Sequence, residues 1–293
     1  MKSALFALIL LFTFFCTPLK AQKTHTDSTD QKKVKKIVWA ESGIYLATMT
    51  GLAILWYEDL STPFRFFNDA KQWQGIDKLG HGFTAFHLTN GNAMLLEKAG
   101  IPRKRAYWTS TAISITAMAG IEVLDGFSPS YGASVPDLMA NTVGALMPLQ
   151  TLWWNDIYIH PKYSFHTTPY ARLRPNTLGS SAFEYWLKDY NGQTYWLSTN
   201  FNLFSPNNSF PDWLAFSIGY GAEEMVYGSP QENRANGYRA VRSLYFSLDV
   251  DFTKFAPENK WLKVLFFGLN MIKVPLPTFE LKNGEMRFHP IYF

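Results

Sequence analysis

The chain has 293 residues, with 27 Lys and Arg against 23 Asp and Glu and a formal net charge of +4. A balance this close to neutral gives no electrostatic basis for binding nucleic acid, and we exclude that partner. Aromatic and charged residues each make up 17% of the chain. Because the charged fraction is below the usual quarter or so of a soluble domain, the composition points to a protein that works at or in a membrane.

Residues 1–21 predict a secretory signal peptide: Lys2 precedes an unbroken apolar run, and Pro18 and Ala21 follow it. Removing its two lysines lowers the basic count from 27 to 25 against 23 acids, a net charge of +2. The only cysteine, Cys16, follows two phenylalanines, whereas a lipoprotein signal has small residues directly before its cysteine. We therefore expect an exported protein of the periplasm or outer membrane of a Gram-negative cell, without lipidation or a disulfide.

The first half of the mature chain predicts helices. Residues 22–36 are polar and are expected to be a flexible lead-in, whereas residues 37–57 are apolar and long enough to cross a bilayer. Four lysines just before this stretch would lie outside the cytoplasm, which the positive-inside rule disfavours, so a packed helix or one lying on a membrane surface fits equally well. Further helices are expected from about Lys78 to Lys98, over 106–124, and from Val135 to Trp154 behind a capping box at Ser134.

Beyond Tyr158 the pattern changes to aromatic runs of period two, which predict an antiparallel β-region of about six strands. Asn191-Gly192 and Asn283-Gly284 each separate two such runs and predict two hairpins. We expect a sheet packed against the helices; the alternative, a lipid-embedded barrel, usually needs about eight strands or more. The fold class is therefore α+β, with about four apolar helices over 37–157 and an aromatic antiparallel β-region over 158–293.

Polar residues occur where the helical pattern would accept apolar ones. The pairs that share a helix face by their spacing are Asp77 with His81, Glu122 with Asp125, and Asp137 with Asn141. Glu122 lies near the end of a neutral helix, where the helix dipole disfavours a negative charge, so it needs a partner, and we expect His81. For three of the polar residues we expect a structural role. Asp77 would be a helix N-cap, Asp137 would be the acid of the capping box, and His87 would be a hydrogen-bonded histidine at a helix interface.

Three motifs carry a resemblance to a known family: DKLGH (77–81), ExxDGFS (122–128) and SxxDLxANxxGA (134–145). Together they resemble the YfiM-like family of predicted periplasmic lipoproteins of unknown function. More distantly they are similar to VanZ-like membrane proteins, which share an Asp-Lys-x-x-His start, a later Glu, and an Asp followed by Asn-x-x-Gly-Ala. The resemblance covers about residues 76–150 and implies an envelope protein with a helical core, without supplying an activity.

Two functions stay open. The first, which we favour, is a membrane-associated structural, ligand-binding or lipid-binding envelope protein, whose polar network consists of Asp77, Lys78, His87, Asp125, Ser134 and Asn141. The second is a hydrolase or transferase in which His81 works with Glu122 or Asp137 as acid–base groups on an amphiphilic substrate. No cofactor is expected; a variant of the second function places Zn²⁺ or Mn²⁺ among these three residues, but no H-E-x-x-H spacing supports it. Lipid is the expected partner, with an envelope protein as an alternative.

Overall fold

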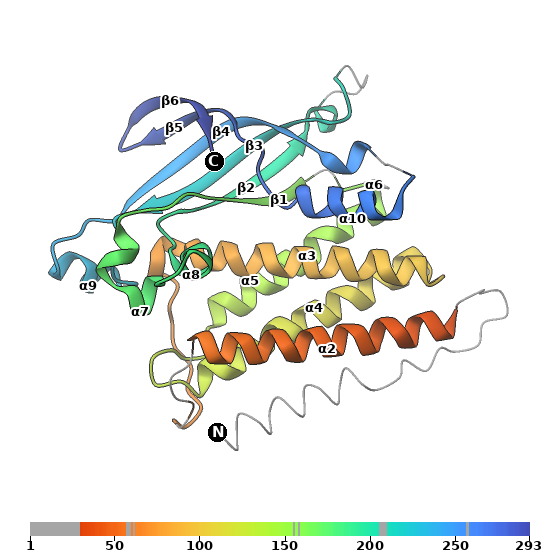
Figure 1. Ribbon diagram of the computed structural model, residues 1–293, viewed down its shortest axis with the longest axis horizontal. Coiled ribbons are helices and arrows are strands. Elements are labelled where there is room, and N and C mark those ends of the chain that lie inside the picture. The colour runs from red at the N-terminus through yellow and green to blue at the C-terminus, as the bar shows by residue number, and fades with distance from the viewer. Residues whose placement is uncertain are drawn as a thin grey trace. The chain divides into compact units, whose positions relative to one another are not determined.

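The computed structural model describes residues 30–56, 60, 62–154, 156–157, 159–204, 210–255 and 258–293. The expected signal peptide, with Cys16, lies outside these residues, as does most of the expected lead-in. The fold is α+β: helices form the N-terminal half and an antiparallel sheet follows (Figure 1). The chain divides into a first unit, residues up to Asp69 with Thr84–Asp156, and a second unit, Ala70–Phe83 with Ile157–Phe293. Residues 70–83, expected in the helical domain, thus group with the sheet.

The helices of the N-terminal half are α2 (Gln31–Trp56), η1 (Gln72–Gly75), α3 (Ile76–Lys98), α4 (Arg103–Gly126), α5 (Val135–Leu146), η2 (Met147–Gln150) and α6 (Thr151–Trp154), where η denotes a 3-10 helix. Because α2 begins at Gln31, residues 31–36 are helical and the expectation of a flexible lead-in is wrong for them. The expected helix from Val135 to Trp154 is divided into α5, η2 and α6, since Pro148 in η2 has no amide hydrogen for a continuous α-helical ladder.

Within the first unit, α4 packs against its neighbours through small residues. A methyl group added at Gly120 would meet the hydroxyl of Tyr45 on α2, so the glycine permits this close approach. Thr111 of α4 donates a hydrogen bond to the carbonyl of Ala145 on α5 over 3.2 Å. Ala145 also belongs to an apolar cluster that joins α3, α4 and α5. These contacts fix α4 and α5, the two helices that carry Glu122 and Asp137.

The second unit contains a six-stranded antiparallel sheet whose strands follow one another in sequence order (Figure 1). They are β1 (Ile159–Phe165), β2 (Gln193–Asn200), β3 (Leu214–Glu223), β4 (Val241–Val250), β5 (Leu276–Lys282) and β6 (Glu285–Tyr292). The connections hold η3 (Tyr170–Leu173), α7 (Pro175–Leu178), α8 (Ala182–Lys188), η4 (Phe201–Leu203), α9 (Pro230–Ala235), η5 (Phe252–Phe255) and α10 (Lys260–Leu269).

The two Asn-Gly pairs have different surroundings. The first expected hairpin is wrong, because residues 182–188 form α8 and Asn191-Gly192 connects this helix to β2. Ser181 starts α8 by accepting a hydrogen bond from the backbone amide of Glu184. Asn283 and Gly284 have φ of 54° and 81° and form the two-residue turn between β5 and β6. This left-handed backbone suits the Asn-Gly pair.

The sheet buries its polar face and exposes much of its apolar face. In β3 and β4 the buried positions include Ala215, Ser217, Ser247 and Asp249, whereas Ile218 and Leu248 are about half exposed. The polar faces of distant strands meet because the sheet curls. The hydroxyl of Tyr292 on β6 lies 3.1 Å from the Thr194 hydroxyl on β2, and residues 271–273, just before β5, hydrogen-bond to the backbone of Tyr163 on β1.

Part of the apolar face is covered by the start of α3, within the second unit. Ile76 is fully buried and packs in a cluster with Tyr195 and Tyr220. The ring of Phe83 lies 6.0 Å from that of Tyr163 and 5.9 Å from that of Tyr195. The expected N-cap at Asp77 is wrong, since α3 begins at Ile76 and Asp77 lies inside its first turn.

Candidate functional site

An extended segment, residues 62–69, places an aspartate beside the start of α5 in the first unit. The backbone amide of Arg65 donates to the carbonyl of Gly126 at the end of α4, over 2.9 Å, and that of Phe67 donates to the carbonyl of Ala133, over 3.0 Å. The segment therefore follows the α4–α5 connection and ends at Asp69, whose carboxylate accepts a hydrogen bond from the Ser134 hydroxyl.

Ser134 is the centre of this polar cluster. Its backbone amide donates to Oε2 of Glu122 over 2.8 Å, and its hydroxyl oxygen accepts from the backbone amide of Asp137 over 3.0 Å. The expected helix cap at Ser134 is confirmed by this second bond. One serine thus links Asp69, Glu122 and Asp137, the last two of which are almost fully buried.

Burial, opposed by the hydrogen bond from Ser134 and reinforced by the negative charges of Asp137, Asp125 and Asp69, raises the pKa of Glu122 to about 8. At neutral pH the side chain is therefore mostly protonated, which removes the cost of a buried charge among other carboxylates. A carboxyl whose pKa lies near the working pH also has the property required of an acid–base catalyst.

The other expected site residues are divided between the units. In the first unit, Asn141 is buried on α5 one turn after Asp137, Asp125 is partly exposed on α4, and His87 on α3 is partly buried beside the ring of Phe86. His81, Asp77 and Lys78 belong to the second unit, where the Lys78 ammonium pairs with Asp77 over 2.7 Å. The pairing of His81 with Glu122 stays a prediction. Sequence reasoning did not identify Asp69, because no local spacing connects it to α4 or α5.

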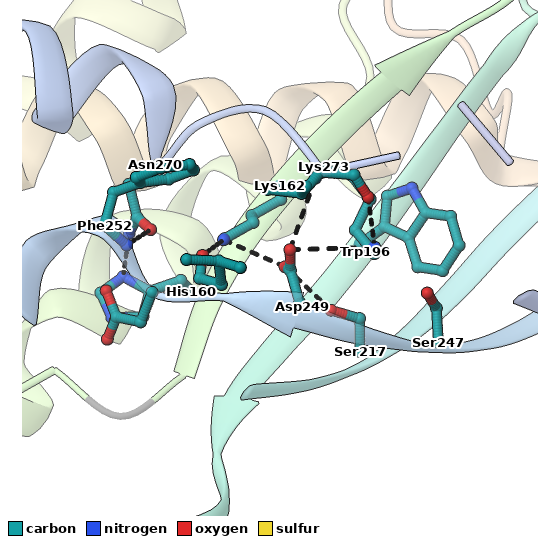
Figure 2. A network of polar contacts seen from close by, with 12 residues as sticks. His160, Lys162, Trp196, Ser217, Ser247, Asp249, Phe252, Asn270 and Lys273 are labelled. Atoms are coloured by element: carbon teal, nitrogen blue, oxygen red, sulfur yellow. Dashed lines mark hydrogen bonds and ion pairs between the residues drawn. The ribbon is translucent and has the colours of Figure 1, made fainter. Parts of the chain in front are cut away.

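A second polar cluster lies inside the curled sheet and was not expected from the sequence. Figure 2 shows Lys162 of β1 and Lys273 converging on Asp249 of β4, with Ser217 beside the carboxylate. The Lys162 ammonium lies 3.0 Å and that of Lys273 3.8 Å from the carboxylate, and Ser217 donates to it over 3.0 Å. The three charged side chains are 0 to 1% exposed.

Backbone carbonyls complete the hydrogen bonding of these two lysines. Lys162 donates to the carbonyl of Val250 over 2.7 Å, and Lys273 donates to those of Leu248 and Val274 over 2.8 and 2.7 Å. Burial lowers the pKa of Lys273 to about 8, with a contribution from the positive charge of Lys162, while Asp249 opposes the shift. The cluster thus joins β1, β3, β4 and the segment before β5 by charge-assisted hydrogen bonds.

Helix α2 presents apolar side chains outside the core of its unit. Among the described residues, one helical stretch, Gln31–Leu55, is long and apolar enough to cross a membrane, and 11% of its apolar window is buried. Trp39, Ile44 and Ile54 are 71%, 66% and 78% exposed. This exposure indicates a surface that is not used for packing against the other residues that the structure describes.

The structure defines an α+β protein with a buried acidic cluster in its first unit. Residues 64–151 match the model of a family described as "Predicted periplasmic lipoprotein (DUF2279)", which is consistent with an exported protein of the periplasm or outer membrane. The matched segment contains Asp69, Glu122, Ser134 and Asp137, so the whole acidic cluster lies within it. No curated protein and no solved structure matches the chain. The family description names lipoproteins, whereas absence of lipidation at Cys16, outside the described residues, stays a prediction.

Proposed function

We propose that this protein is a membrane-associated structural or ligand-binding protein of the envelope, held at a membrane through α2. The observation that carries the proposal is the exposure of Trp39, Ile44 and Ile54 along a helix of membrane-spanning length. Exposed apolar area costs about 25 cal/mol per Å², so a helix of this kind gains stability where lipid covers it. Lipid is accordingly the proposed partner, and an envelope protein that covers the same helix is the alternative.

In this proposal the acidic cluster stabilises the helical unit. Asp69, Glu122 and Asp137 each exchange a hydrogen bond with Ser134, which joins segment 62–69, α4 and the start of α5. A hydrogen-bonded network of this kind specifies one arrangement of helices without performing chemistry. The further likeness to YfiM-like proteins, and to VanZ-like membrane proteins, belongs to this proposal and agrees with a helical unit that works at a membrane.

Fractionation of cells that produce the mature protein tests membrane association. We expect the protein in a membrane fraction, retained after a high-salt wash and released by detergent, because apolar contacts are not screened by salt. A variant with Trp39→Glu, Ile44→Glu and Ile54→Glu should leave a clearly larger share of the protein in the soluble periplasmic fraction than the wild type does. A matched control changes the exposed α2 lysines Lys32 and Lys35 to glutamine and should stay with the membrane. Wild-type protein in the soluble fraction would contradict the proposal.

A second candidate function is favoured by the pKa of Glu122, which lies at about 8. We propose as the alternative an envelope hydrolase or transferase, in which Glu122 or Asp137 and His81 act as acid and base on an amphiphilic substrate. In the metal variant these same three residues hold Zn²⁺ or Mn²⁺.

Two substitutions separate the alternatives. If the residues are catalytic, His81→Gln and Glu122→Gln leave folding and export intact but abolish the phenotype that the intact gene restores to a deletion strain. If they are structural, neither variant loses function while it remains folded, and any loss follows the amount of folded protein. Circular dichroism and protein level in the envelope fraction provide the necessary comparison.

A further inference from the structure

The curled sheet carries a continuous apolar surface on its outer side. Strand register aligns five side chains across β2 to β6, which we name the outer row: Leu197, Ile218, Phe246, Phe279 and Phe288. Four of them are about half exposed, and Phe246 is partly exposed. The flanking rows on the same face, from Leu244 to Met286 and from Phe216 to Leu248, are also without charge, whereas Tyr220 beside Leu244 is covered by the start of α3. The surface is therefore apolar across most of the sheet.

The neighbouring row, made of the residues next to the outer row in each strand, is polar. Its members, which point inward, are Ser198, Ser217, Ser247, Thr278 and His289. The first four are buried, and Ser217 belongs to the cluster of Asp249 with its two lysines. In a sheet that faces water, the apolar row is buried and the polar row is exposed. Here β2 to β5 alternate in the reverse sense.

This reversal favours lipid as the material that covers the outer row. Hydrocarbon offers no hydrogen-bond partner, so a surface in contact with it must be apolar and must satisfy its polar groups internally. Protein interfaces have polar rims with hydrogen bonds, which the uncharged rows do not provide. The same unit also has an exposed apolar helix, α10, with Trp261 82% exposed and Val264 60% exposed, as is typical of segments at a membrane interface.

We propose that the outer row contacts the hydrocarbon region of a lipid bilayer. The inference rests on the proposed membrane association but goes beyond it, because α2 alone could hold the protein at a membrane while the sheet stayed in water. It also assigns a role to the inward polar clusters, since they supply within the sheet the polar contacts that lipid cannot.

Site-directed labelling tests this contact in the full mature chain. The expected mature chain has no cysteine, so Ile218→Cys and Phe279→Cys each allow attachment of one polarity-sensitive fluorophore. Asn236→Cys, at an exposed polar position of the same unit, is the control. Each labelled protein is reconstituted into vesicles of phosphatidylethanolamine and phosphatidylglycerol, with and without a nitroxide quencher on the acyl chains. We expect a blue-shifted emission and strong quenching at positions 218 and 279, and neither effect at 236.

Three results would overturn the inference, and one of them also affects the proposed function. Protein that sediments with vesicles but shows no quenching at 218 or 279 leaves the proposed function standing and rejects lipid contact by the sheet. Blue-shifted emission without quenching, increasing with protein concentration, identifies a second copy as the covering partner. Failure to sediment with vesicles rejects the proposed function together with the inference.

Discussion

Asp249 lies between two buried lysines, so its replacement leaves two positive charges without their shared anion. We expect Asp249→Asn to lower the free energy of unfolding by about 3–5 kcal/mol, the usual cost of breaking a buried ion pair by removing one partner. Lys273→Met is the matched comparison, because it keeps the pair between Lys162 and Asp249 and removes a cation whose pKa burial has lowered. Lys273→Met should lower the free energy of unfolding clearly less than Asp249→Asn does. Urea denaturation in mild detergent measures this free energy for both variants, and equal losses would show that Asp249 is not the shared partner of the two lysines.

Glu122 predicts a pH dependence of stability in the first unit. Its pKa is raised from 4.5 to about 8 in the folded protein, mainly by burial, so between these values the folded chain holds a proton that the unfolded chain releases. The contribution of Glu122 to the free energy of unfolding is therefore largest below pH 4.5, falls as the pH rises through this window, and levels off above about pH 8.

Glu122→Gln should flatten this profile, since an amide does not titrate and its oxygen can still accept the Ser134 hydrogen bond. Glu122→Ala should instead cost ~1–3 kcal/mol, because it removes the acceptor of a buried amide. Thermal unfolding at a series of pH values distinguishes these results. Glu258→Gln, at an exposed position, is the control and should keep the wild-type profile. A wild-type slope in Glu122→Gln would show that other groups cause the pH dependence.

At the scale of elements, the cap of α5 connects local helix stability to the acidic cluster. The Ser134 hydroxyl accepts from the amide of Asp137 and donates to Asp69, so Ser134→Ala removes both interactions. We expect a loss of roughly 1–2 kcal/mol, in the upper part of the range for helix caps. Ser181→Ala at α8 is the comparison, because it removes a cap in an exposed region and should cost less. Amide hydrogen exchange at the first turns of α5 and α8 measures the loss of local stability in each variant separately.

The sequence pattern predicted some elements of the fold correctly and others wrongly. Period-two patterns predicted strands at β3 and β4, because alternation follows directly from strand geometry. They did not predict that the polar side is the buried one, since alternation has the same period in either sense. The aromatic residues of 183–190 predict a strand, although the spacing of Ser181 and Glu184 is a helix-start signal and residues 182–188 form α8.

In the candidate site, local features were predictable from the sequence and tertiary contacts were not. Local spacing predicted the cap at Ser134, and the position of Glu122 near the end of a neutral helix predicted that its charge would need compensation. The contact of Asp69 with Ser134 depends on the path of segment 62–69, and the meeting of Lys162, Asp249 and Lys273 depends on the curl of the sheet. Contacts of this kind are set by tertiary structure and leave no periodic signal in the sequence.

At the scale of the whole molecule, each unit has its own exposed apolar surface: α2 in the first and the outer row in the second. If both surfaces contact lipid, each should contribute separately to partition into vesicles. Glutamate substitutions at Trp39 and Ile44 weaken the first surface, and Ile218→Lys with Phe279→Lys weakens the second. A charge facing the centre of a bilayer costs about 2–4 kcal/mol in a membrane sheet. Because about 1.4 kcal/mol corresponds to a factor of ten, the lysine pair should lower the partition coefficient by well over tenfold, and the glutamate pair by a smaller factor.

Effects at distant, independent sites add as free energies, so the fourfold variant should show the product of the two losses. Vesicle sedimentation over a range of lipid concentrations measures the coefficients, and circular dichroism establishes that each variant is folded. A fourfold variant no weaker than the α2 variant would show that α2 alone holds the protein, with the sheet away from lipid. A loss well short of the product, with both pairs weakening partition on their own, would show that the two surfaces act as one cooperative membrane contact, because each pair alone would then already remove the coupling between them.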